Sequence, residues 1–128
     1  MFIQNLNKEQ QSAFLFLAQE LINSDGKLES QELIIMDTII QQTGGGVQPK
    51  ALQLHELPIV FDSNLSKNSA LLELISIAYS DGQYHDDEKK LISEYTKALN
   101  IKDEQLLQLE NWVKKQLSLI KDANEFFK

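Results

Sequence analysis

Four acidic residues stand at matching places in the sequence and have the chemistry to bind a divalent cation. In each of two segments an Asp-Gly pair is followed by a glutamate seven positions after the aspartate: Asp25 with Glu32, and Asp81 with Glu88. Hard cations prefer several oxygen ligands from carboxylates, carbonyls and water. We therefore expect these carboxylates to bind calcium or magnesium, ahead of manganese or zinc, in one shared site or in two half-sites.

A structural role explains the same residues without a metal. A glutamate in the first turn of a helix is stabilised by the helix dipole, and an aspartate before glycine is common in turns. An aspartate at the end of a helix opposes the dipole, but hydrogen bonds to the amides of the next helix would offset this cost. Both interpretations of Asp25, Glu32, Asp81 and Glu88 therefore stay open.

An EF-hand calcium loop is excluded by the order of the residues. Such a loop needs acidic or amide side chains at its first, third and fifth positions, glycine at the sixth and glutamate at the twelfth. Here glycine follows the aspartate directly, Lys27 and Gln83 occupy the third position, and the glutamate comes too early. His85, in an acidic turn, is expected to be solvated, with the alternative that it adds a nitrogen ligand for zinc or manganese.

The two acidic segments lie inside a longer internal repeat. When the sequence is shifted so that residue 25 meets residue 81, Ser24-Asp-Gly aligns with Ser80-Asp-Gly, and apolar positions align on both sides. This pattern predicts two helix–Asp-Gly turn–helix units. One such hairpin leaves part of its apolar surface exposed, so we expect the two to pack together around a pseudo-two-fold axis, through the helices that precede the turns.

Helical periodicity runs through almost the whole chain, and sustained alternation typical of strands is missing. We predict an all-α, single-domain bundle of about five to seven helices. Its parts are repeat one at about 8–43, a connector at 44–65, repeat two at about 66–100, and a C-terminal helix at about 103–120, within one domain spanning 1–128.

Local signals place several helix ends. Asn7 and Gln10 have the spacing of a capping box at the start of the first helix. Ser66 is expected to cap the helix before the second turn, and a short helix at 51–57 is expected to stop before Pro58. Trp112 is expected to belong to the core.

Composition limits the function classes. The formal charge is −7, and the lysine pairs lie beside acidic residues, so we expect no nucleic-acid binding. No apolar run approaches the length of a membrane span, and no cysteine is present, so we expect a soluble protein of the cytoplasm. The sequence lacks the motifs of cysteine, serine and zinc hydrolases, so we expect no enzymatic activity.

The two segments Leu21-Ile-Asn-Ser-Asp-Gly-Lys-Leu-Glu-Ser-Gln-Glu32 and Ile77-Ala-Tyr-Ser-Asp-Gly-Gln-Tyr-His-Asp-Asp-Glu88 resemble the signature turns of TerB-like domains, over roughly residues 10–115. The resemblance implies an all-helical fold with internal pseudosymmetry and a metal-binding surface at the acidic turns. It also implies a role in stress-response or membrane-linked assemblies. Ser24 and Ser80 replace the usual alanine, and Lys27 adds a positive charge.

Three functions follow as hypotheses. The first is a TerB-like module that binds a divalent cation, a protein partner or both through its acidic turns. The second is a metal-free interaction domain that binds a helix or peptide in an apolar groove. The third is a hydrolase that uses the carboxylates.

Overall fold

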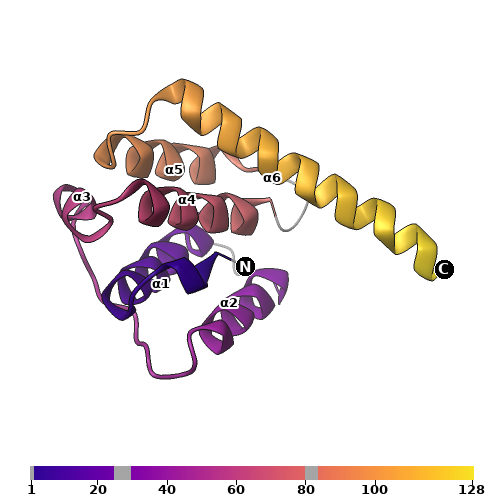
Figure 1. Cartoon of the computed structure of the whole chain (residues 1–128), viewed down its shortest axis with the longest axis horizontal. Coiled ribbons are helices and arrows are strands. Elements are labelled where there is room, and N and C mark those ends of the chain that lie inside the picture. Colours follow the sequence, from indigo (N-terminus) through magenta and orange to yellow (C-terminus); the bar gives the residue numbers. More distant parts are fainter. Residues whose placement is uncertain (1, 25–29, 80–83) are drawn as a thin grey trace.

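The structure is built from helices joined by short connections (Figure 1). The computed structural model describes residues 2–24, 30–79 and 84–128, and it leaves the side chains of residues 30–32 undescribed. Over these ranges it contains no strand, so the all-α class and the expected number of helices are confirmed. The α-helices are α1 (Lys8–Ile22), α2 (Ser30–Gln42), α3 (Leu57–Val60), α4 (Asn64–Ala78), α5 (Asp86–Ala98) and α6 (Asp103–Asn124), and the short 3₁₀ helices are η1 (Ile3–Asn5), η2 (Leu54–Glu56) and η3 (Glu125–Phe127).

The first long helix begins at the predicted capping box. The side-chain oxygen of Asn7 accepts a 2.8 Å hydrogen bond from the amide of Gln10, and the Gln10 side chain accepts a 3.0 Å bond from the amide of Asn7. These two bonds satisfy amides that the first turn of a helix leaves without an intrahelical partner. The start of α1 was therefore predicted correctly from residues that are close in sequence.

Two predicted helix ends are wrong. The helix α4 is capped by Ser63, whose Oγ accepts a 3.1 Å bond from the amide of Ser66, so Ser66 lies inside the first turn. Pro58 does not end a helix, because it lies in the first turn of α3. Proline is tolerated there, since the first amides of a helix have no acceptor within it.

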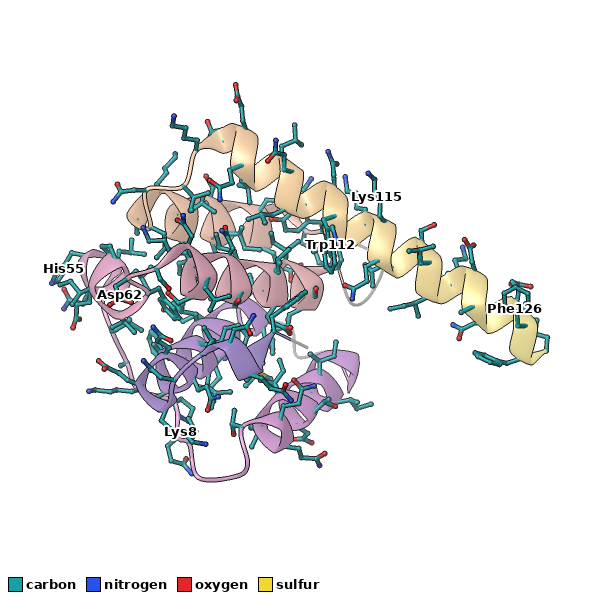
Figure 2. The ribbon with its side chains drawn as sticks, in the orientation of Figure 1. Lys8, His55, Asp62, Trp112, Lys115 and Phe126 are labelled. Carbon is teal, nitrogen blue, oxygen red and sulfur yellow. The ribbon has the colours of Figure 1, made fainter. Side chains whose placement is uncertain are left out.

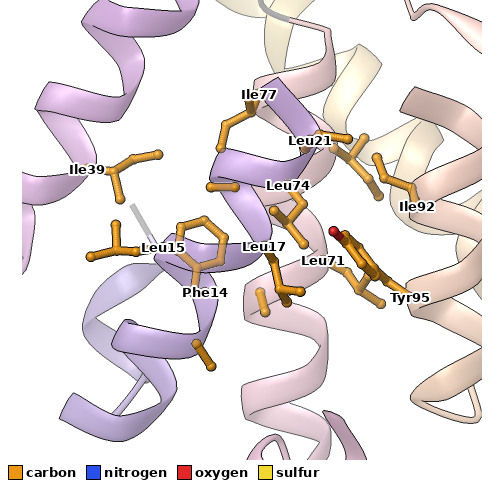
Figure 3. Close-up of a cluster of buried hydrophobic side chains, with 14 of the residues drawn as sticks. Phe14, Leu15, Leu17, Leu21, Ile39, Leu71, Leu74, Ile77, Ile92 and Tyr95 are labelled. Atoms are coloured by element: carbon orange, nitrogen blue, oxygen red, sulfur yellow. The ribbon is translucent and has the colours of Figure 1, made fainter. Parts of the chain in front are cut away.

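The core lies mainly between α1 and α4, which pack against each other. Phe14, Leu15 and Leu21 from α1 and Leu71 and Leu74 from α4 are all buried (Figure 3). Burying a side chain of this size stabilises the fold by about 1.5–3 kcal/mol. The predicted contact between the apolar helices of the two repeats is thus confirmed, while the two-fold relation between the repeats remains a prediction.

The remaining helices cover different sides of this pair. The helix α2 packs against α1 and η1, whereas α5 packs against α4, α1, α3 and η2. Tyr95 and Ile92 bring α5 into the core, and Val113 does the same for α6. This arrangement places the start of α5 beside the end of α1, which positions the site described below.

The last helix differs from its prediction in length and rotation. It continues to Asn124, past the expected end near residue 120, and its second half projects beyond the other helices (Figure 1). Val113 is buried, while Trp112 is 41% exposed and lies beside the ring of Phe2, with centroids 5.6 Å apart. Trp112 is therefore a surface residue with one aromatic contact, not the core residue that we expected. Within the described ranges, every helix falls short of the length or the apolarity that crossing a membrane requires.

Candidate functional site

Glu88 is the predicted metal ligand whose surroundings are described, and it is 2% exposed. Its Oε1 accepts a 3.3 Å hydrogen bond from the amide of His85 at the start of α5. This bond satisfies an amide that the helix leaves open, as a glutamate in a first turn can do without a metal. The bonds expected of the two aspartates lie outside the described residues. His85 is partly buried, and the choice between a solvated histidine and a metal ligand remains a prediction.

The other three predicted ligands cannot be placed in the same way. Asp25 and Asp81 lie outside the described residues, and so does the side chain of Glu32, although its backbone belongs to α2. Among the residues that are described, no three His, Asp or Glu side chains gather closely enough to hold a metal ion. The grouping of the four carboxylates therefore remains a prediction.

Two tyrosines flank the second acidic turn and connect three helices. The rings of Tyr79, at the end of α4, and Tyr84, just before α5, have centroids 4.7 Å apart. The Tyr84 hydroxyl donates a hydrogen bond to Glu110 of α6. Burial raises the pKa of Tyr84 above its ordinary value, and the negative charge of Glu110 and this hydrogen bond raise it further.

Lysine side chains cover both tyrosine rings. Nζ of Lys89 lies 5.4 Å from the Tyr84 ring centroid, and Nζ of Lys114 lies 5.7 Å from that of Tyr79. At such distances an ammonium group is attracted to the ring face by about 0.5–1 kcal/mol in exposed positions. These contacts connect α5 and α6 to the flanks of the second turn. These contacts were not predicted: the pairs Tyr79–Tyr84 and Tyr84–Lys89 are each five residues apart, and Tyr79–Lys114 spans 35 positions.

A polar groove runs between the end of α1 and the start of α5. Its volume is about 530 Å³, and Phe16, Gln19, Glu20, Asn23, Ser24, Asp87, Lys90, Leu91 and Glu94 line it. Ser24 directly precedes Asp25, and Asp87 directly precedes Glu88. The groove therefore brings together the sequence neighbours of one predicted ligand from each repeat.

The groove is acidic on both walls. Glu20 comes from α1, and Asp87 and Glu94 come from α5, where Lys90 provides the opposite charge. The α5 residues 87, 90, 91 and 94 have the spacing of one helical face, which is a sequence signal that could have identified this wall. Glu20 had no such signal, because its partners lie more than seventy residues away.

Two further hollows follow along α5 toward η2, the first of mixed polarity and the second apolar. A hollow of about 250 Å³ shares Glu20, Leu91 and Glu94 with the polar groove and adds Leu52, Leu54 and Leu57 among its walls. A further hollow of about 370 Å³ is lined by Leu54, His55, Glu94, Lys97 and Ala98. We call the three connected hollows the α5 groove. It has an acidic end near the turns and an apolar end near η2.

The described elements define a small all-helical domain with a surface groove along one helix. Residues 61–111 match the family model described as tellurite resistance protein TerB. The match begins just before α4, includes α5 and ends within α6. Residues 61–111 are thus similar to TerB, and the TerB-like resemblance is confirmed over this part of the chain, which holds the second of the two Asp-Gly segments. No curated protein and no solved structure shows significant similarity to the chain.

Proposed function

We propose that the chain is a non-enzymatic TerB-like module that binds a divalent cation, a protein partner or both at its paired acidic turns. The observation that supports this proposal is the shared groove, because Ser24 and Asp87 both line it and adjoin Asp25 and Glu88. A cation held by Asp25, Glu32, Asp81 and Glu88 would connect the two repeats. Calcium or magnesium suits such an oxygen-rich ligand set better than zinc.

Calorimetric titration of the metal-free chain tests the proposal. Calcium, magnesium, manganese and zinc are added separately to the protein after treatment with a chelator. We expect heat of binding and a higher melting temperature with at least one of them, because a ligand that binds the folded state stabilises it. Asp25→Asn and Asp81→Asn should each weaken binding by about tenfold or more, since each removes a charged ligand.

Asp62→Asn is the matched control. It makes the same chemical change at an exposed residue between α3 and α4, directly before Ser63, the cap of α4 (Figure 2). Binding that is equally weak in this variant would point to general electrostatic attraction. The absence of both heat and a thermal shift with all four cations would overturn the cation part of the proposal.

The apolar end of the α5 groove favours a second candidate function, the binding of a helix or peptide. Leu54 is 45% exposed there and lines both the hollow of mixed polarity and the apolar one. An amphipathic helix binds such a groove with apolar residues spaced three and four apart. Leu54→Asp would place a charge between the two hollows and should prevent this binding, while leaving binding of cations at the turns unchanged. We propose that either activity serves a cytoplasmic assembly, of the stress-response kind that the family implies.

A further inference from the structure

The projecting end of α6 exposes a stripe of large apolar side chains. From Leu119 onward, Ile120, Phe126 and Phe127 are each more than half exposed, with Phe126 at 86% and Phe127 at 79% (Figure 2). Positions 119, 120 and 123 have the spacing of one face of α6, with alanine at 123, and Phe126 and Phe127 follow directly in η3. We call residues 114–128 the arm. In the described part of the structure, the extensive contacts of α6 are with α4 and η3.

The arm and the rest of the chain carry opposite charge. Residues 114–128 hold four lysines and two acidic side chains, a net charge of +2, whereas the preceding residues hold eight lysines and seventeen acidic side chains, a net charge of −9. The strongly negative remainder makes an anionic surface such as a membrane or nucleic acid an unfavourable partner for the chain. For the basic, apolar arm, the favourable partner is an acidic protein surface with apolar hollows.

The α5 groove has these properties. Its polar end is acidic through Glu20, Asp87 and Glu94, and its other end is apolar around Leu54. At 1.5 Å per helical residue, the segment of α5 that lines it, residues 87–98, is roughly 16 Å long, and the apolar stripe of the arm, residues 119–127, is roughly 12 Å long and fits within it. The arm projects away from its own body, so the groove that it can reach belongs to another molecule (Figure 1).

We propose that the arm of one copy docks in the α5 groove of a second copy, with Phe126 and Phe127 at the apolar end and the part of the arm that carries Lys115 and Lys121 toward the acidic end. This proposal rests on the second candidate function, the binding of a helix in the groove, and it names the helix. Two copies related by a two-fold axis exchange arms reciprocally. A buried phenylalanine removes about 150–250 Å² from water, so four of them supply about 600–1,000 Å², roughly half of a standard interface, before the groove surface is counted.

The oligomeric state of the full chain is the first test. Sedimentation velocity over a concentration series should show a monomer–dimer equilibrium, weakened at high salt because part of the attraction is between opposite charges. The double variant Phe126→Ser, Phe127→Ser should raise the dimer dissociation constant by about tenfold or more. Leu54→Asp should do the same from the groove side. Both changes are at exposed positions, so the fold should persist, which circular dichroism checks.

Ile59→Ser is the matched control, because Ile59 is 72% exposed on α3 and is not among the residues lining the α5 groove. It should leave the dissociation constant unchanged. A full chain that remains monomeric at every concentration overturns the proposal. The proposal is also overturned if the native chain forms no dimer but binds vesicles of anionic lipid, and the arm variant loses that binding. The arm would then be a membrane anchor.

Cysteine cross-linking locates the contact, since the chain contains no native cysteine. Protein carrying Ile120→Cys is mixed with protein carrying Gln19→Cys and oxidised. We expect a disulfide between the two proteins. When Ile59→Cys replaces Gln19→Cys as a control, much less of this disulfide should form. Preferential pairing of Ile120→Cys with itself would overturn docking in the groove, because the arms would then pair with each other.

A synthetic peptide of residues 114–128 separates this inference from the function on which it rests. Suppose that the peptide binds the full chain, that Leu54→Asp abolishes this binding, and that the full chain is strictly monomeric. The groove would then bind a helix as proposed, but a second copy would not be its occupant. If the peptide does not bind and the chain is monomeric, both fail.

Discussion

The hydroxyl group of Tyr95 in α5 donates a 2.8 Å hydrogen bond to Oε1 of Glu20 in α1, across 75 residues of sequence. The Tyr95 side chain is buried, whereas Glu20 is exposed at the wall of the α5 groove. The bond therefore fixes the separation of the two helices that form the groove. It also orients one of the three groove carboxylates.

Replacing this tyrosine by phenylalanine isolates the hydrogen bond. Tyr95→Phe keeps the buried ring and removes the donor, so the free energy of unfolding should fall by about 1–2 kcal/mol. This loss is small for a hydrogen bond to a charged group, because water can hydrate the exposed Glu20 carboxylate once the bond is gone. Urea unfolding followed by circular dichroism measures the change. Glu20→Gln keeps an acceptor and should cost less. Equal stability of Tyr95→Phe and the native chain would show that the bond does not form in solution.

Alkaline pH should destabilise the fold through two tyrosines. Burial, followed by the interactions with Glu20, raises the pKa of Tyr95, and burial followed by Glu110 raises the pKa of Tyr84. Both hydroxyls stay protonated in the folded state when the unfolded chain begins to lose these protons near pH 10. Stability is therefore complete below about pH 10 and falls above it, by up to about 1.4 kcal/mol per pH unit for each tyrosine.

Urea midpoints measured between pH 8 and about pH 11 check this decline. Tyr95→Phe removes one of the two groups, so its stability should fall less steeply with pH than that of the native chain. A parallel decline in the two proteins would contradict the assignment to Tyr95 and leave Tyr84 as the group responsible.

The contact between α1 and α4 should dominate stability. Leu74 of α4 is 1% exposed, and truncation to alanine leaves a cavity between the helices, so Leu74→Ala should lower the free energy of unfolding by about 2–5 kcal/mol. Leu65→Ala makes the same change on the same helix at a residue that is 60% exposed, and it should alter stability by less than about 0.5 kcal/mol. Similar losses in the two variants would mean that α4 is not packed as described.

Local sequence signals predicted the parts of this fold that depend on neighbouring residues. The capping box of Asn7 and Gln10 was predictable, because both partners lie within one turn. The start of α4 was missed since Ser63 and Ser66 are both good capping residues in the same motif, and their local preferences do not separate them. Trp112 and Val113 are neighbours on α6, and which of them faces the core depends on the rotation of the helix against α4.

The candidate site was less accessible from the sequence. The Asp-Gly repeat predicted carboxylates at the turns and led to the family, because its spacing occurs twice. The groove arises where α1 meets α5, and Glu20 and Glu94 reach it through tertiary packing that no local pattern specifies. The arm was missed for a related reason: an apolar helical face predicts burial, and only the architecture reveals that nothing in the described chain covers it.

The three adjacent glycines in the connector should respond differently to the same substitution. Gly44 and Gly45 have φ angles of +83° and +81°, whereas Gly46 is not in the left-handed region. A Cβ atom would meet no close contact at any of the three, so the difference lies in the backbone. Gly44→Ala and Gly45→Ala should each lower the free energy of unfolding by about 1–2 kcal/mol, because a side chain disfavours this conformation.

Gly46→Ala should leave stability unchanged or raise it by up to about 1 kcal/mol, since alanine restricts the unfolded chain more than glycine does. The opposite signs at adjacent positions make thermal unfolding of the three variants a sensitive test of the connector. Losses at all three positions would show that the backbone at Gly46 also needs glycine. The Lys8 ammonium group donates a 2.7 Å hydrogen bond to the carbonyl of Thr43, just before Gly44. If Gly44→Ala caused no loss of stability, the turn after Thr43 would adopt another conformation in solution.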